Sequence, residues 1–160
     1  MTRKVLIHDT EATPEQQFEE EEAVVAGLGA VQVVIRTLTS AEILTIASVP
    51  IELVAGEAGK YIWPISALLV YHYDADVFTD PGNIVFVGPS GVPVGLHCEA
   101  FQALIGGSAS RLTICKPAAP GTLVGLGDGV ALSLWGDLGD VTGGGSGTLD
   151  VIVIYRKVAV

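Results

Sequence analysis

The sequence predicts an all-β fold: an antiparallel β-sandwich with jelly-roll-like topology, short helical turns and an N-terminal arm. About seven or eight short apolar segments recur at intervals of roughly 10–20 residues, with Gly, Pro and Asp between them. No long helical pattern alternates with these segments, as a parallel α/β sheet would require. Short strands joined by tight turns are typical of two packed antiparallel sheets.

The stretch over 59–87 is expected to form the centre of a sheet. Residues 59–73 are so dense in β-branched and aromatic types that both faces of this strand are predicted to be covered. Pro64 cannot donate a ladder hydrogen bond, so it predicts a break or bulge that bends the strand from one sheet into the other. A turn over 74–82 then leads into a strand over 83–87.

The remaining elements are short. Thr39 and Glu42 have the spacing of a capping box, which predicts one helical turn over 39–44. A second short helix is predicted over 96–105, closed by two glycines. The Asp128–Gly129 pair suits a hairpin turn, and 136–147 is predicted to be a flexible loop. The other predicted strands are 30–36, 51–54, 111–116, 123–124, 130–135 and 148–156.

Charge divides the chain into two parts. The formal net charge is −10, and residues 1–22 alone hold seven acidic and two basic residues. This uneven distribution of charge predicts an acidic N-terminal arm over 1–29 and a β-sandwich domain over 30–160. The arm is expected to hold a short strand over 2–8 and either a helix over 16–26 or a solvated, mobile segment. Its candidate contacts with a partner or a neighbouring subunit are Val5, Ile7, Phe18, Val24 and Val25.

Composition excludes some partners and favours others. Hydrophobic residues make up 49% of the chain without its 20 glycines, more apolar surface than one small domain usually hides, which favours subunit contacts. Only eight basic residues are present, so no nucleic acid partner is expected. No run approaches the roughly 18 apolar residues that span a bilayer, so no membrane partner is expected. Without a secretory signal, Cys98 and Cys115 are expected to be buried thiols rather than a disulfide.

No pattern predicts a catalytic or metal site, so the chain is not expected to be an enzyme or to need a cofactor. His97-Cys98-Glu99 has the H-x-E spacing of zinc deaminases but lacks the Pro-Cys-x-x-Cys partner, and it is expected to lie in the short helix. His72, between two tyrosines, is expected at a sheet face rather than as a general base. The Gly-rich segments lack a phosphate-binding ending, and no Gly-x-Ser-x-Gly elbow is present.

One acidic turn leaves an alternative open. Asp74, Asp76, Asp80 and Asn83 offer oxygen ligands that suit calcium, but EF-hand spacing fails because Val85 stands at the twelfth position. Ordinary turn chemistry around Asp80-Pro81-Gly82 is favoured, with an irregular calcium loop as the alternative.

Several stretches carry a resemblance to known proteins. They read Leu-Thr-Ser-Ala-Glu-Ile-Leu at 38–44, Pro-Ile-Glu-Leu-Val at 50–54, Ala-Gly-Lys at 58–60, and Gly-Thr-Leu-Asp-Val-Ile-Val-Ile-Tyr-Arg at 147–156. In this order they resemble a group of small tailed-bacteriophage virion accessory proteins of the capsid decoration, or cement, type. The likeness covers residues 38–70 and 147–157.

The resemblance implies a structural virion protein. It would be a homotrimer that binds the major capsid protein of the same virion on the outer capsid surface and stabilises the shell, after synthesis in the host cytoplasm. Two alternatives remain: a tail or head-fibre component, and a carbohydrate- or ligand-binding β-sandwich module. Because sugar sites stack on exposed aromatics, the placement of Trp63 and Trp135 inside apolar runs favours burial over sugar binding.

Overall fold

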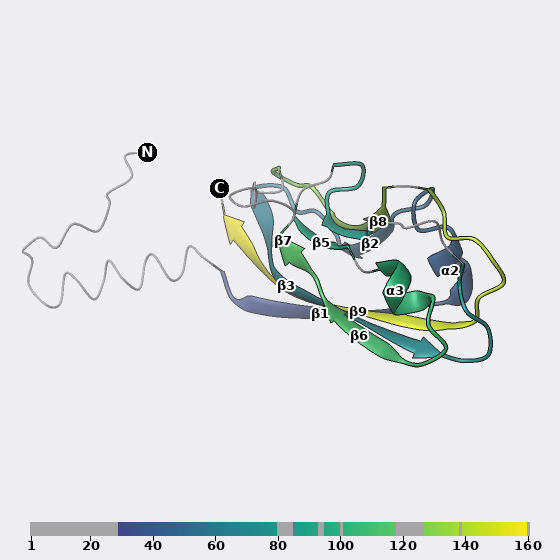
Figure 1. Cartoon of the computed structure of the whole chain (residues 1–160). Coiled ribbons are helices and arrows are strands. Elements are labelled where there is room, and N and C mark those ends of the chain that lie inside the picture. Colours follow the sequence, from purple (N-terminus) through teal and green to yellow (C-terminus); the bar gives the residue numbers. More distant parts are fainter. Residues whose placement is uncertain are drawn as a thin grey trace, which may run out of the picture.

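The computed structural model describes residues 29–79, 85–92, 95–99, 101–117, 127–137 and 139–159, and in this part of the chain two antiparallel sheets stack face to face (Figure 1). This confirms the predicted all-β sandwich. Of the predicted arm over 1–29, only Gly29 lies within the described residues. In spatial order the four-stranded sheet holds β1 (Val31–Leu38), β9 (Gly147–Ala159), β3 (Lys60–Tyr73) and β6 (Arg111–Ile114). The five-stranded sheet holds β2 (Ile51–Val54), β8 (Leu132–Gly136), β4 (Val85–Gly88), β5 (Leu96–Cys98) and β7 (Lys116–Pro117).

The strand pairing is nested, which identifies the sandwich as a jelly roll. Apart from the two-residue β7, the first strand pairs with the last, the second with the last but one, and so on inward: β1 with β9, β2 with β8, β3 with β6, and β4 with β5. A long antiparallel hairpin rolled over on itself produces this order. The pairs β3–β9 and β4–β8 then join the two halves of each sheet.

The core lies between the sheets and is closed at one end by two short helices. Alternate residues of β9 and β3 are buried, such as Val151, Val153 and Leu69. Helices α2 (Ser40–Leu44) and α3 (Phe101–Ile105) lie at the end of the sandwich away from the C-terminus and add further buried side chains (Figure 1). The predicted capping box of α2 is confirmed, because Thr39 and Glu42 exchange backbone and side-chain hydrogen bonds.

For strand β3, one part of the prediction is confirmed and two parts are wrong. Its register with β9 shifts between Pro64 and Ser66, which is the predicted bulge. The predicted passage into the other sheet is wrong, because β3 pairs with β9 on both sides of the bulge. The prediction that both faces are covered is also wrong within this chain. One face alternates into the core, whereas the other leaves Trp63 46% exposed.

The chain crosses between the sheets at Cys115 instead. The Cys115 N–H still donates to the Ala67 carbonyl of β3 (2.8 Å), whereas the next residue, Lys116, pairs with His97 of β5 in the other sheet. The predicted strand over 111–116 is therefore two strands, β6 and β7. A single residue turns the chain from one layer to the other.

The structure corrects the predicted second helix and contains the predicted turn at Asp128–Gly129. The predicted helix over 96–105 begins only at Phe101, because residues 96–98 pair with β4 as a strand. The predicted turn at Asp128–Gly129 is present, with Val130 N–H donating to the Gly127 carbonyl (3.1 Å). Its predicted partner strand over 123–124 lies outside the described residues. No described helix is long and apolar enough to cross a membrane.

Candidate functional site

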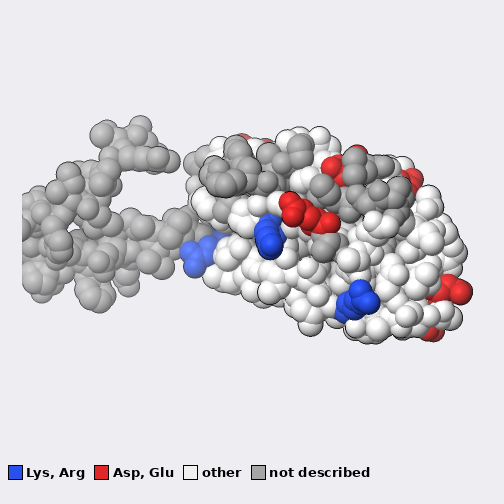
Figure 2. Space-filling model, in the orientation of Figure 1, with Lys and Arg blue, Asp and Glu red and all other residues white. Residues whose placement is uncertain are grey.

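The most distinctive surface of the molecule is the outward face of the four-stranded sheet, called here the outer sheet face. Its apolar side chains come from all four strands, and no described residue packs over them. In Figure 2 the lower side of the molecule, along which Figure 1 places β1, β6 and β9, is mostly free of charged atoms. The members between 36% and 66% exposed are Val31, Val33, Ile35, Trp63, Ile65, Leu112, Ile114 and Ile154.

The strand register builds this face row by row. Residues directly opposite each other in antiparallel strands project to the same side of the sheet. Ile35 of β1 is opposite Ile152 of β9, which is opposite Leu68 of β3, which is opposite Ile114 of β6. An unbroken aliphatic row therefore crosses the whole sheet.

Polar groups mark the two ends of the outer sheet face. At one end the Asp150 carboxylate accepts a hydrogen bond from the Thr37 hydroxyl (2.6 Å) and contacts His72 Nε2 (2.8 Å). At the other end, Arg156 stands beside Trp63 and Val31. Asp150 and Arg156 lie six positions apart on β9, about 20 Å along the strand. Apart from Ser66, which is opposite Ile154, the described residues between these two ends are apolar.

The Thr37–Asp150–His72 group is a hydrogen-bonded cluster on the sheet surface. Thr37 and His72 both contact the carboxylate, so they flank Asp150 rather than forming a relay from one to the next. A nucleophilic triad needs the base to contact the nucleophile and the carboxylate to contact the base. His72 lies at a sheet face, where the sequence places it.

The carboxylates of this structure predict a loss of stability in acid. The Thr37 hydroxyl, and after it His72, hold the pKa of Asp150 below its usual value, and hydrogen bonds from Thr39 do the same for Glu42. A group with a depressed pKa in the folded state stabilises the fold above its unfolded pKa, about 4, and loses that contribution as pH falls through the folded value. The thermal midpoint is therefore expected to fall between pH 5 and pH 3.

Thermal scans at several pH values, with an Asp150→Asn variant, measure this effect. The variant should show a shallower fall than the wild type, because one of the titrating groups has been removed. A wild-type midpoint that stays constant from pH 5 to pH 3 contradicts the prediction.

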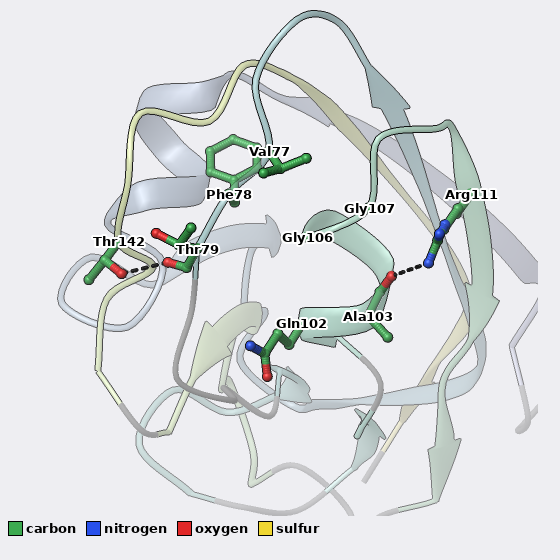
Figure 3. Close-up of a pocket in the computed structure, with 9 residues that line it drawn as sticks. All are labelled: Val77, Phe78, Thr79, Gln102, Ala103, Gly106, Gly107, Arg111 and Thr142. Atoms are coloured by element: carbon green, nitrogen blue, oxygen red, sulfur yellow. Dashed lines mark hydrogen bonds between the residues drawn. The ribbon is translucent and has the colours of Figure 1, made fainter.

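An open pocket of about 680 Å³ lies beside α3 and is shown in Figure 3. The Arg111 guanidinium on its rim donates to the Ala103 carbonyl (2.8 Å), and the segments at Thr79 and Thr142 are held together by backbone hydrogen bonds. Phe78 in its wall is 1% exposed and packs against Tyr71 in the core. The lining that the structure describes therefore offers one cation, already hydrogen-bonded, and no exposed aromatic ring.

The sequence motifs considered for metal binding are separated or differently placed. His97 lies in β5, not in a helix, and its Nε2 is 3.1 Å from Glu99. Among the described residues no three His, Cys, Asp or Glu side chains come together. Asp74 and Asp76 are exposed, whereas Asp80 and Asn83 lie outside the described residues, so the calcium alternative stays untested.

The two cysteines are buried, and no disulfide joins them. Burial, and after it the neighbouring Cys98 thiol, raises the pKa of Cys115 to about 12. A thiol with so high a pKa carries almost no thiolate at neutral pH and is a poor nucleophile and metal ligand.

The outer sheet face contains none of the residues selected from the sequence as candidate contacts. Those residues, Val5, Ile7, Phe18, Val24 and Val25, lie in the part of the chain that the structure does not describe. The signal for the face was nevertheless present in the sequence, because apolar residues occupy alternate positions 31, 33 and 35, and again 112 and 114. The positions between them are mostly polar, namely Gln32, Arg36 and Thr113. An alternating pattern of this kind normally assigns its apolar side to the core, so the sequence alone does not show that this side faces outward.

Comparison with known proteins finds chains of two phage capsids that are similar to this chain at low sequence identity. No protein-family model and no curated protein matches the chain. A chain of the cyanophage Pam1 capsid asymmetric unit is similar with a TM-score of 0.48 and 17% identity, over 81% of this chain and 86% of that one. A chain of the Ralstonia phage GP4 capsid is similar with a TM-score of 0.42 and 16% identity, over 81% and 85%. Similarity at this level does not identify a function.

Proposed function

We propose that this protein is a structural component of a tailed-phage particle: a capsid decoration, or cement, protein that binds the outer capsid surface as a homotrimer and stabilises the shell. The observation that carries the proposal is the outer sheet face, an exposed apolar surface of the kind that contacts with other protein chains cover. The resemblance of residues 38–70 and 147–157 to phage accessory proteins supports the same class. A jelly roll that presents a broad apolar sheet face suits this role.

The proposed partner on the particle is the major capsid protein, bound in part through the N-terminal arm. The arm is acidic and contains the apolar residues Val5, Ile7 and Phe18. An acidic segment of this kind buries little apolar surface by itself, so a partner surface is needed to offset the entropy of ordering it. The protein is proposed to act in the virion after synthesis in the host cytoplasm, without catalysis, cofactor or metal.

A ligand-binding module fits the described surface less well. Contrary to the sequence prediction, Trp63 is exposed, as the aromatic ring of a sugar site would be. Its neighbours on the sheet are Val31, Ile65 and Arg156, which form a flat, mostly apolar surface without the several polar groups that orient a sugar. The other tryptophan, Trp135, is buried as predicted and stacks on Phe86 at 4.8 Å between ring centres.

Particles that lack the protein test the proposed function. Capsids from which the chain has been stripped or deleted should rupture at a lower temperature than complete particles, and adding the purified protein back should restore the rupture temperature. Rupture that is unchanged by its removal contradicts the cement function and favours the alternative of a tail or head-fibre component.

The arm gives a second measurement in the same assay. A variant that lacks residues 1–29 should keep the thermal midpoint of the isolated protein, because the described core residues all lie between Leu38 and Tyr155. The same variant should bind stripped particles more weakly than the full chain. A large loss of thermal stability with full binding would instead make the arm part of the domain.

A further inference from the structure

We propose that the outer sheet face is the contact between copies of this chain, and that three copies turn these faces toward a common three-fold axis. The three four-stranded sheets would then be the sides of a triangular prism, with a second apolar core inside it. This inference rests on the proposed trimer and assigns the surface that forms it. The partner for this face is thus a second and a third copy of the chain rather than the capsid.

The width of the sheet fits a three-fold prism. Strands lie about 4.8 Å apart, so a four-stranded sheet is about 19 Å wide. In a triangular prism with sides of that width, each side lies about 5.5 Å from the axis. Packed sheets are about 10 Å apart, so the side chains of each sheet reach about 5 Å. Side chains from three sheets of this width therefore meet at the axis, whereas six-stranded sheets would leave an open channel.

The distribution of residues fits such an interior. Strands β9 and β3 are central in the sheet and would lie nearest the axis, where they place Ile152 and Leu68. Asp150 and Arg156 stand at the two ends, where the prism opens to solvent. Among the acidic residues that the structure describes, only Asp150 lies on this face, although the chain has a net charge of −10. Negatively charged copies would thus meet through their least acidic surface.

The free edges of the sheet fit the same arrangement. The two edge strands are β1 and β6, whose outer backbone groups have no partner strand in the described chain. At each corner of the prism, β1 of one copy would lie beside β6 of the next. A ring of three heterologous contacts closes on itself and covers all six edges, which otherwise invite uncontrolled strand pairing. Two copies packed face to face would cover the faces but leave every edge open.

The amount of surface supports an interface between copies. The apolar face measures on the order of 20 Å by 20 Å, which is the size of the largest apolar patch on a typical monomer, and such patches are often functional. Stable interfaces take about 800 Å² from each partner, and interfaces between permanent subunits are the more apolar class. The face alone covers about 400 Å², so the edge strands β1 and β6 must supply the rest of each contact.

A charge placed at the centre of the face tests which surface joins the copies. By light scattering at low micromolar concentration, the full-length wild type should have three times the chain mass of 16.5 kDa, and Ile152→Glu should have the mass of one chain. The matched control is Val49→Glu, which places the same charge at an exposed apolar residue off this face and should stay trimeric. Circular dichroism shows whether each variant is folded. A folded Ile152→Glu protein that stays trimeric overturns the inference.

A cross-linking variant tests the prism even where the charged variant fails to fold. Ile35 of β1 and Ile114 of β6 lie in one row of the sheet, so at each corner they would be level with each other across neighbouring copies. An Ile35→Cys/Ile114→Cys double variant should oxidise to covalent trimers on a non-reducing gel, and each single variant should not. Covalent dimers as the only product, or no product, would overturn the prism.

The outcomes also separate this inference from the proposed function. A trimer with these cross-links whose removal leaves capsid rupture unchanged would keep the inference and reject the cement function. A wild-type monomer in solution, or a trimeric Ile152→Glu variant that no longer binds stripped capsids, would reject the inference. In the second case the outer sheet face would be the capsid contact, and the cement function would stand.

Discussion

Replacing Leu134 by alanine should lower the free energy of unfolding by about 2–5 kcal/mol, the usual cost of removing a large aliphatic side chain from a core. Leu134 is 0% exposed and projects from β8 into the space between the sheets. It stands between Ile51 of β2 and Val87 of β4, so neither neighbour can move in to fill the cavity without disturbing a ladder. Urea denaturation at a fixed protein concentration measures the change.

The control for this prediction is Val49→Ala. Val49 is 58% exposed and does not belong to the outer sheet face, so its truncation should change stability by no more than about 0.5 kcal/mol. Equal losses for the two variants would mean that Leu134 is not part of the main core.

Gly147→Ala is expected to have the second large effect, about 2–4 kcal/mol, because two costs coincide at this position. Its φ of +121° is a backbone conformation that residues with a side chain rarely adopt. A methyl group there would lie 2.4 Å from the carbonyl oxygen of His72, which belongs to the backbone of β3. Because Gly147 opens β9 opposite Tyr73, relieving the clash would force the first pair of the central ladder apart.

Two other glycines separate these costs. Gly59 has a φ of +77° but open space around it, so Gly59→Ala should lose only the conformational part, about 1 kcal/mol. Gly144 has open space and no positive φ, so Gly144→Ala should be nearly neutral. The thermal midpoint should therefore be highest for Gly144→Ala, lower for Gly59→Ala and lowest for Gly147→Ala. Equal midpoints for the first and last variants would refute the steric explanation.

The sequence was sufficient wherever local chemistry decides the structure. Thr39 and Glu42 form their capping box because the four residues 39–42 contain all the necessary groups. Pro64 produces its bulge because the missing N–H is a property of the residue itself. The jelly roll follows from short strands and turns, together with the rule that such strands pair as antiparallel sheets. These predictions depend on few or no distant contacts.

Predictions from the sequence were wrong where the structure depends on which distant segment packs against a residue. A continuous apolar run over 59–73 requires cover on both faces, but it does not say whether the cover belongs to the same chain. Trp63 was therefore predicted to be buried and is exposed in the single chain. Residues 96–98 became a strand because β4 lies beside them, which no local pattern encodes. The outer sheet face itself could not be recognised until the register had placed four separate strands side by side.

The nested strand order also determines when the protein can fold during synthesis. Thr37 on β1 bonds to Asp150 on β9, 113 positions later, and β9 is also the neighbour of β3. When β1 and β3 leave the ribosome, the strand that must lie between them has not yet been made. Sandwiches dominated by such distant pairings fold in milliseconds to seconds. Until β9 emerges, the apolar faces of the nascent chain have no partner strand, so the incomplete chain is expected to be most prone to aggregation during this interval.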